Sequence, residues 1–172
     1  MLNAIQAIRG SIDDTLRKGE REGMSGFRKL PPFERSLAAI VLTAKESVIA
    51  PMRPKLREHN ITEPQWRVMR VLNDRGATDA TCLSDVGLLH APSVTRILKD
   101  LEERKFVVRE PDAHDGRRTL VALTPAGREI VKVISRDVLR VMREYSERFG
   151  AERLERLANE LRALSAAIKG VE

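Results

Sequence analysis

Residues 91–123 have the sequence APSVTRILKDLEERKFVVREPDAHDGRRTLVAL, in which the spacing of apolar residues changes from helical to extended. Four apolar residues at positions i, i+3, i+4 and i+7 form one helical face: Val94, Ile97, Leu98 and Leu101. After Arg104 the period becomes two, and it predicts strands over 106–109 and 119–123 with a polar tip between them. A helix followed directly by a β-hairpin is therefore expected.

Two shorter helices are predicted immediately before this stretch. Thr62 and Gln65 have the spacing of a capping box, in which each side chain binds the other residue's backbone amide, so a helix is expected over 63–74. Asp79 or Thr81 then caps a short helix that ends before the longer one begins. Three helices and a hairpin in this order form a winged helix-turn-helix.

Longer helices bracket the winged helix-turn-helix in the sequence. A helical pattern covers 33–59, where Pro51 and Pro54 each remove an amide donor and are expected to kink or break the helix. Two amphipathic patterns follow the hairpin, over 125–148 and 154–170. The expected domains are a polar N-terminal extension (1–32), a helical dimerisation region (33–60 and 125–172) and a winged helix-turn-helix (61–124).

The fold class that follows is mainly α with a small β-hairpin wing. The apolar stripe between Leu154 and Ile168 has too little of its own chain to cover it. Burying that stripe against a second copy would solve this problem, so we expect a homodimer.

Composition excludes several classes of protein. A single cysteine rules out an internal disulfide framework, and no apolar run approaches the ~20 residues of a membrane span, so a cytoplasmic protein without a membrane partner is expected. The three histidines lie far apart and lack companion ligands at metal spacing: His59, His90 and His114. No nucleophile motif is present, so we expect that the chain is not an enzyme. We also expect no metal and no cofactor, and we expect Cys82 to be a packing residue.

The net charge of +6 favours a polyanionic partner only weakly, because residues 60–125 hold ten basic and ten acidic side chains. Any contact with DNA must therefore come from a few placed side chains. On the helix these are the residues of the polar face, Ser93, Thr95, Arg96 and Lys99. On the hairpin tip they are Asp115, Arg117 and Arg118. Without this context, the same residues would be an ordinary solvated surface.

Four segments of the chain resemble the MarR family of bacterial transcription regulators: residues 89–96, 101–102, 115–118 and 123–127. The resemblance covers about residues 33–170. It implies a dimer that places two recognition helices on double-stranded DNA, at an inverted-repeat operator, with Arg117 entering the minor groove. Residues 52–54, 58–60 and 62–67 further resemble the regulators of homoprotocatechuate (aromatic acid) degradation operons.

One departure from the family pattern bears on the fold. Family members commonly have glycine at the end of the recognition helix, where this chain has Lys105. A left-handed residue other than glycine costs roughly 1 kcal/mol, so the turn is expected to differ in detail.

A candidate pocket for a small aromatic effector lies at the junction of the first two core helices. Trp66 would supply an aromatic wall and one arginine a bidentate clamp for a carboxylate. The candidate residues are Arg53, His59, Trp66, Arg67 and Arg70. The plain alternative is that Trp66 belongs to the core and the arginines are solvated or paired with Glu58 and Glu63.

Two functions therefore remain open from the sequence. The favoured one is a dimeric repressor that a small aromatic acid or its thioester releases from DNA. The alternative is a helical dimerisation and protein-interaction module whose winged helix does not bind DNA, and the neutral charge of residues 60–125 is its main support.

Overall fold

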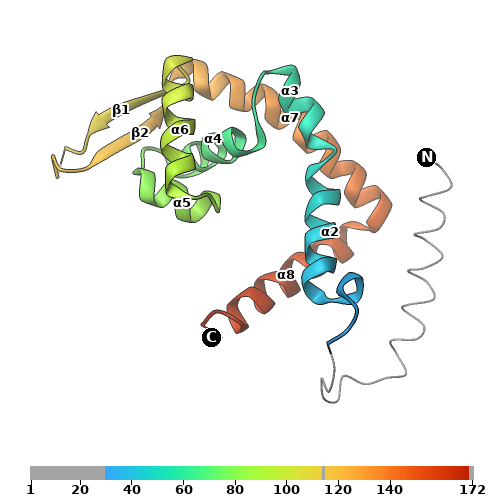
Figure 1. Ribbon diagram of the computed structural model, residues 1–172. Helices are drawn as coiled ribbons and strands as arrows, with labels where there is room; N and C mark the ends of the chain where they lie inside the picture. The colour runs from blue at the N-terminus through green and yellow to red at the C-terminus, as the bar shows by residue number, and fades with distance from the viewer. Residues whose placement is uncertain (1–29, 114, 171–172) are drawn as a thin grey trace. The chain divides into compact units, whose positions relative to one another are not determined.

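The computed structural model describes residues 30–113 and 115–170, and it is mainly helical with one two-stranded sheet (Figure 1). This confirms the predicted fold class. The chain divides into two compact units, residues 1–45 and 46–172, and each is described by itself. Most of the predicted N-terminal extension, and His114, lie outside the described residues.

The first unit contains the 3₁₀ turn η1 (Phe33–Arg35) and most of α2 (Leu37–Ile49). The helix predicted from Phe33 begins at Leu37 instead. Ser36 is the reason, because its Oγ accepts a hydrogen bond from the Ala39 amide at 3.1 Å and so caps the first turn.

The second unit contains the end of α2 and all remaining elements. These are α3 (Met52–Glu58), α4 (Glu63–Arg75), α5 (Ala80–Gly87), α6 (Ala91–Glu103), β1 (Val107–Pro111), β2 (Thr119–Leu123), α7 (Pro125–Phe149) and α8 (Ala151–Ala167). The strands pair antiparallel, with Val107 opposite Leu123 and Pro111 opposite Thr119. In Figure 1 the hairpin extends away from α4, α5 and α6.

The single helix predicted over 33–59 is interrupted, as the two prolines indicated. It ends at Ile49 and restarts at Met52, so the break falls at Pro51 rather than at Pro54. The Arg53 amide donates to the Ala50 carbonyl at 3.3 Å, which satisfies one group at the break. Pro54 lies in the first turn of the new helix, where its missing amide costs nothing.

The predicted caps are confirmed. The Gln65 amide donates to Thr62 Oγ1 at 3.4 Å, and the Thr62 amide donates to Gln65 Oε1 at 2.8 Å, which completes the capping box. Asp79 rather than Thr81 caps α5, since its carboxylate accepts from the Cys82 amide at 2.8 Å. Thr124 caps α7 through the Gly127 amide at 3.0 Å.

The core of the second unit gathers around α4 and α6. Val68 and Met69 of α4 and Val94 of α6 are fully buried. The helical stripe predicted on α6 is confirmed, because three of its four members are buried and the fourth, Ile97, packs at the edge of the core. Burial of this stripe turns the opposite, polar face of α6 to the outside.

The turn after α6 is left-handed at Lys105, a conformation in which glycine is the usual residue. Lys105 has a φ of 60°, which a residue with a Cβ adopts at a cost of about 1 kcal/mol. The Phe106 amide donates to the Leu101 carbonyl at 2.8 Å and closes the turn. The chain therefore reverses direction directly into β1 without a glycine.

Gly127 provides a test of how closely α7 approaches the hairpin. An added Cβ at Gly127 would lie 2.0 Å from the Phe106 carbonyl oxygen. Alanine normally stabilises a helix relative to glycine by about 1 kcal/mol, but here we expect Gly127→Ala to lower the free energy of unfolding by about 1–3 kcal/mol. Chemical denaturation at fixed protein concentration measures the change.

Gly116→Ala serves as the matched control, because an added Cβ there meets no atom within 4 Å. It should leave the stability nearly unchanged. A Gly127→Ala protein as stable as the control would contradict the close approach.

Candidate functional site

The outward face of α6 carries the four predicted DNA-contact residues of the helix. All four are exposed: Ser93, Thr95, Arg96 and Lys99. Thr95 Oγ1 donates to the Ala91 carbonyl at 3.3 Å, and Lys99 lies 3.9 Å from Glu103. Among the described residues Arg96 has no side-chain partner, so its guanidinium is available to a ligand.

Polar contacts on the other side of α6 fix its position. Gln65 Nε2 donates to Asp100 Oδ2 at 2.6 Å, which joins the start of α4 to the last turn of α6. Arg104 donates to the Asn60 carbonyl at 2.8 Å, and its guanidinium lies 4.8 Å from the centre of the Phe106 ring. These contacts hold the segment between α3 and α4 against the end of α6.

The turn between α5 and α6 is held by Arg67. Its guanidinium donates to the carbonyls of Gly87 at 3.0 Å and Leu88 at 3.2 Å, where α5 ends. Leu88 has a φ of 52° and ends the helix, and the last carbonyls of a helix have no partner within it. The sequence predicted Arg67 as a ligand residue, and spacing could not reveal this capping role because the partners lie about 20 residues away.

The two arginines of the hairpin tip, Arg117 and Arg118, have different surroundings. Asp115 Oδ1 accepts from the backbone amide of Arg117 at 3.1 Å rather than from its guanidinium. The side chain of Arg117 is exposed and has no partner among the described residues. Arg118 forms an ion pair with Asp79, the cap of α5. Only Arg117 therefore presents a free cation at the tip, within the part of the chain that the structure describes.

The carboxylate of Asp79 serves two partners. One oxygen accepts from the Cys82 amide and the other from Arg118. The Cys82 amide first, and Arg118 second, hold the pKa of this carboxyl below its ordinary value. Asp79 therefore stays ionised at neutral pH. Cys82 is half-buried, and its Sγ lies 3.8 Å from Arg75.

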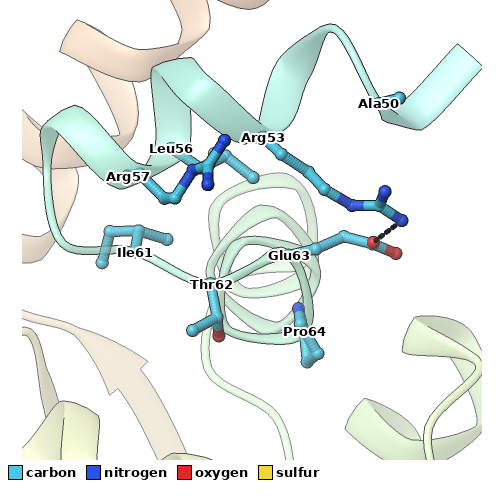
Figure 2. Close-up of a pocket in the computed structure, with 8 residues that line it drawn as sticks. All are labelled: Ala50, Arg53, Leu56, Arg57, Ile61, Thr62, Glu63 and Pro64. Atoms are coloured by element: carbon cyan, nitrogen blue, oxygen red, sulfur yellow. Dashed lines mark ion pairs between the residues drawn. The ribbon is translucent and has the colours of Figure 1, made fainter.

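A pocket of about 590 Å³ lies between α3 and the start of α4 (Figure 2). Its lining residues are Ala50, Arg53, Leu56, Arg57, Ile61, Thr62, Glu63 and Pro64. Figure 2 shows Arg53 extending from α3 to Glu63 at the start of α4, at an N···O distance of 3.5 Å. Arg53 also pairs with Glu46. A ligand that enters this pocket would meet a salt bridge and an apolar floor.

The five predicted ligand residues do not all line this pocket. Only Arg53 does. The guanidinium of Arg70 lies 5.7 Å from the centre of the Trp66 ring and 3.2 Å from Asp74, while its buried Nε has no partner. The His59 carbonyl accepts from Arg104 at 3.5 Å. The structure thus separates an Arg53 group from a Trp66–Arg70 group.

Two kinds of feature are absent from the described residues. No group of three or more His, Cys, Asp or Glu side chains there is arranged to hold a metal ion. No helix among them is long and apolar enough to cross a membrane.

The exposed face of α6 beside a hairpin with a free arginine defines a winged helix-turn-helix of the DNA-binding type. The sequence model of the MarR family matches residues 59–118. The homoprotocatechuate degradative operon repressor of Escherichia coli is 29% identical over 124 residues, which cover 72% of this chain and 84% of the relative.

Two solved structures are also similar. The transcriptional regulator PA4135 is 34% identical with a TM-score of 0.72, over 76% of this chain and 96% of that one. NadR in complex with 4-hydroxyphenylacetate is 30% identical with a TM-score of 0.70, over 80% of this chain and 97% of that one. The chain belongs to the MarR family and is a DNA-binding transcription regulator. These relatives are regulators, which indicates that the chain is not an enzyme.

The free cation at the hairpin tip predicts a specific effect of mutation. Arg117→Ala should weaken binding to the duplex upstream of the chain's own gene by roughly 1–3 kcal/mol. The slope of log affinity against log salt should become shallower by about 0.9 for each phosphate that the variant no longer neutralises. Fluorescence anisotropy over a salt series measures both quantities.

Arg140→Ala removes the same charge from α7, outside the helix and hairpin, and serves as the control. It should leave affinity and slope nearly unchanged. A folded Arg117→Ala protein that binds like this control would contradict the wing contact.

Proposed function

We propose that this chain is a homodimeric repressor that binds an inverted-repeat operator and is released by a small aromatic acid or its thioester. The observation that carries the proposal is the pairing of the exposed α6 face with the free Arg117 of the hairpin. Ser93 and Thr95 are short, so the helix can approach base edges closely, and Arg96 can reach bases or phosphates. Lys99 completes the proposed contact surface of α6, and Asp115 and Arg118 belong to the hairpin tip that carries Arg117.

The apolar side of α8 supports a homodimer. Leu157, Leu161 and Ile168 are exposed to 44%, 40% and 54% in the single chain. No residue of α8 is buried, although leucine recurs at helical spacing along it. A second copy would cover this stripe, and two recognition helices about one turn of DNA apart would then read an inverted repeat.

The dimer proposal predicts the effect of a charge in the stripe. Leu161→Asp would bury an unpaired carboxylate between the copies, so the dimer should dissociate or the chain should unfold. Sedimentation velocity and thermal unfolding measure the outcome. Asn159→Asp adds the same carboxylate at an exposed polar position of α8 and should remain dimeric. A Leu161→Asp protein that is as dimeric and as stable as this control would contradict the proposal.

An aromatic acid is the proposed effector class. The relatives support it, because one represses a homoprotocatechuate operon and another binds 4-hydroxyphenylacetate. The Arg53 group offers a pocket, and the Trp66–Arg70 group offers an aromatic ring beside a guanidinium. Arg67 is the weakest candidate for the clamp, because two carbonyls already use its donors. His59 remains a candidate, because Arg57 and Ile61, two residues before and after it in the chain, line the pocket.

The effector must favour a dimer whose recognition helices are misplaced for the operator, since otherwise no difference in affinity would arise. The contacts of Gln65 with Asp100 and of Arg104 with Asn60 support such coupling. They join the segment between α3 and α4, in which Ile61 and Thr62 line the pocket, and the start of α4 directly to α6. A shift of this segment on ligand binding would therefore move the recognition helix.

Trp66 is the only tryptophan, so its emission reports on one site. Aromatic acids should change this emission saturably, and the same concentrations should release the operator duplex. The methyl ester of an active acid should bind worse by roughly 1.5–3 kcal/mol, because it cannot form the same hydrogen bond to a charged group. Fluorescence titration and anisotropy measure the two effects.

Arg53→Ala and Arg70→Ala, tested singly, should show one large and one small decrease of effector affinity, with Arg67→Ala small. If aromatic acids and their coenzyme A thioesters change neither emission nor DNA binding, the effector proposal fails. DNA binding would still stand on α6 and the hairpin.

The alternative function is a protein-interaction module without DNA binding. The equal numbers of basic and acidic residues over 60–125 favour it. A gel shift with the chain's own upstream region decides between the two functions. Absence of any shift at low salt would support the alternative.

A further inference from the structure

The segment before α5 is joined to the wing by main-chain hydrogen bonds. The Thr78 amide donates to the Val121 carbonyl at 3.0 Å, and the Val121 amide donates to the Thr78 carbonyl at 2.8 Å. Thr78 thus forms an isolated antiparallel bridge with Val121 in β2. A two-stranded hairpin is barely stable alone, so this bridge supports the base of the wing.

Asp79, the residue after Thr78, connects the start of α5 with the hairpin tip. Asp79 caps α5 with one oxygen and pairs with Arg118 through the other. Arg118 directly precedes β2, and its carbonyl accepts from the Asp112 amide at 2.9 Å across the hairpin. One carboxylate therefore fixes both the start of a helix and the end of the tip.

The two neighbouring arginines have different surroundings. Arg118 is directed back to the cap of α5, whereas the side chain of Arg117 has no partner among residues 30–113 and 115–170. Both remain partly exposed, so residue type and exposure alone do not distinguish them. Their partners do.

We propose that Arg118 is a positioning residue that, with Asp79, sets the direction of the wing relative to α5 and α6, while Arg117 makes the DNA contact. This inference rests on the proposed function, in which the wing meets DNA. The physical reason is that the ion pair between Asp79 and Arg118 ties the end of the hairpin tip to the start of α5 and so restricts its movement. A restrained tip loses less conformational freedom when it binds.

The rival explanation is that Arg118 leaves Asp79 and contacts a phosphate. The two explanations differ in the sign of one effect. If Arg118 positions the wing, Asp79→Asn should weaken DNA binding, since it removes the partner. If Arg118 binds a phosphate, Asp79→Asn should leave binding unchanged or tighten it, because it frees a cation and removes a negative charge.

The test measures anisotropy of a fluorescent duplex from the chain's own upstream region, over a salt series, with the full-length protein. Arg118→Ala and Asp79→Asn should each weaken binding about two- to fivefold, the effect expected of a half-exposed ion pair. The double variant should be no weaker than either single one. The salt slope should stay at the wild-type value, whereas Arg117→Ala makes it shallower.

Three controls separate positioning from general stability and charge. Asparagine still caps a helix, so the melting temperature of Asp79→Asn should remain close to wild type. Asp85→Asn removes an exposed carboxylate from the same helix, and it reports the general effect of charge. Arg118→Lys keeps a cation beside Asp79 and should restore most of the affinity.

A second measurement does not depend on DNA. Hydrogen exchange of the Val121 amide should speed up in Arg118→Ala and in Asp79→Asn, but not in Arg117→Ala. Failure of the wild-type protein to bind the duplex would overturn the proposed function. Unchanged exchange of the Val121 amide in Arg118→Ala and Asp79→Asn would show that the Asp79–Arg118 pair does not hold the wing in place. A shallower salt slope for Arg118→Ala, or tighter binding by Asp79→Asn than by Asp85→Asn, would overturn the positioning role.

Discussion

Burial of the apolar side of α6 is the interaction on which the other features depend. Val94, Leu98 and Leu101 are almost completely inaccessible and lie in the same core as α4 and the hairpin. Because an amphipathic helix buried on one side exposes the other, this packing also determines which residues face a ligand. Stability and the proposed recognition surface therefore come from one pattern of residues, and a change on the buried side would displace the exposed side.

The arginines of residues 60–125, a region whose net charge is zero, differ in what they contact. Several of its arginines are used inside the domain: Arg67 at the end of α5, Arg104 at the segment before α4, and Arg118 at the cap of α5. Each holds a turn or a strand that would otherwise be weakly attached. A few cations, chiefly Arg96 and Arg117, are left for DNA. Net charge over this region is thus a poor guide to its function, because it counts internal and external arginines alike.

Local features of the fold could be predicted from the sequence, and long-range contacts could not. The capping box of Thr62 and the helical stripe of α6 depend on residues within one or two turns, so spacing alone predicts them. The partners of Arg67 and Arg118 lie about 20 and 40 residues away, and several carbonyls or carboxylates could serve. The predicted ligand residues separated into two groups for the same reason.

The central claim is that α6 and the hairpin together contact DNA as a symmetric pair. Hydroxyl-radical footprinting of the wild-type protein on its upstream region tests this claim most directly. We expect two protected segments related by an inverted repeat, with centres about one helical turn apart and minor-groove protection outside each. A single protected segment, or no protection at salt concentrations where the protein is a folded dimer, would contradict the claim.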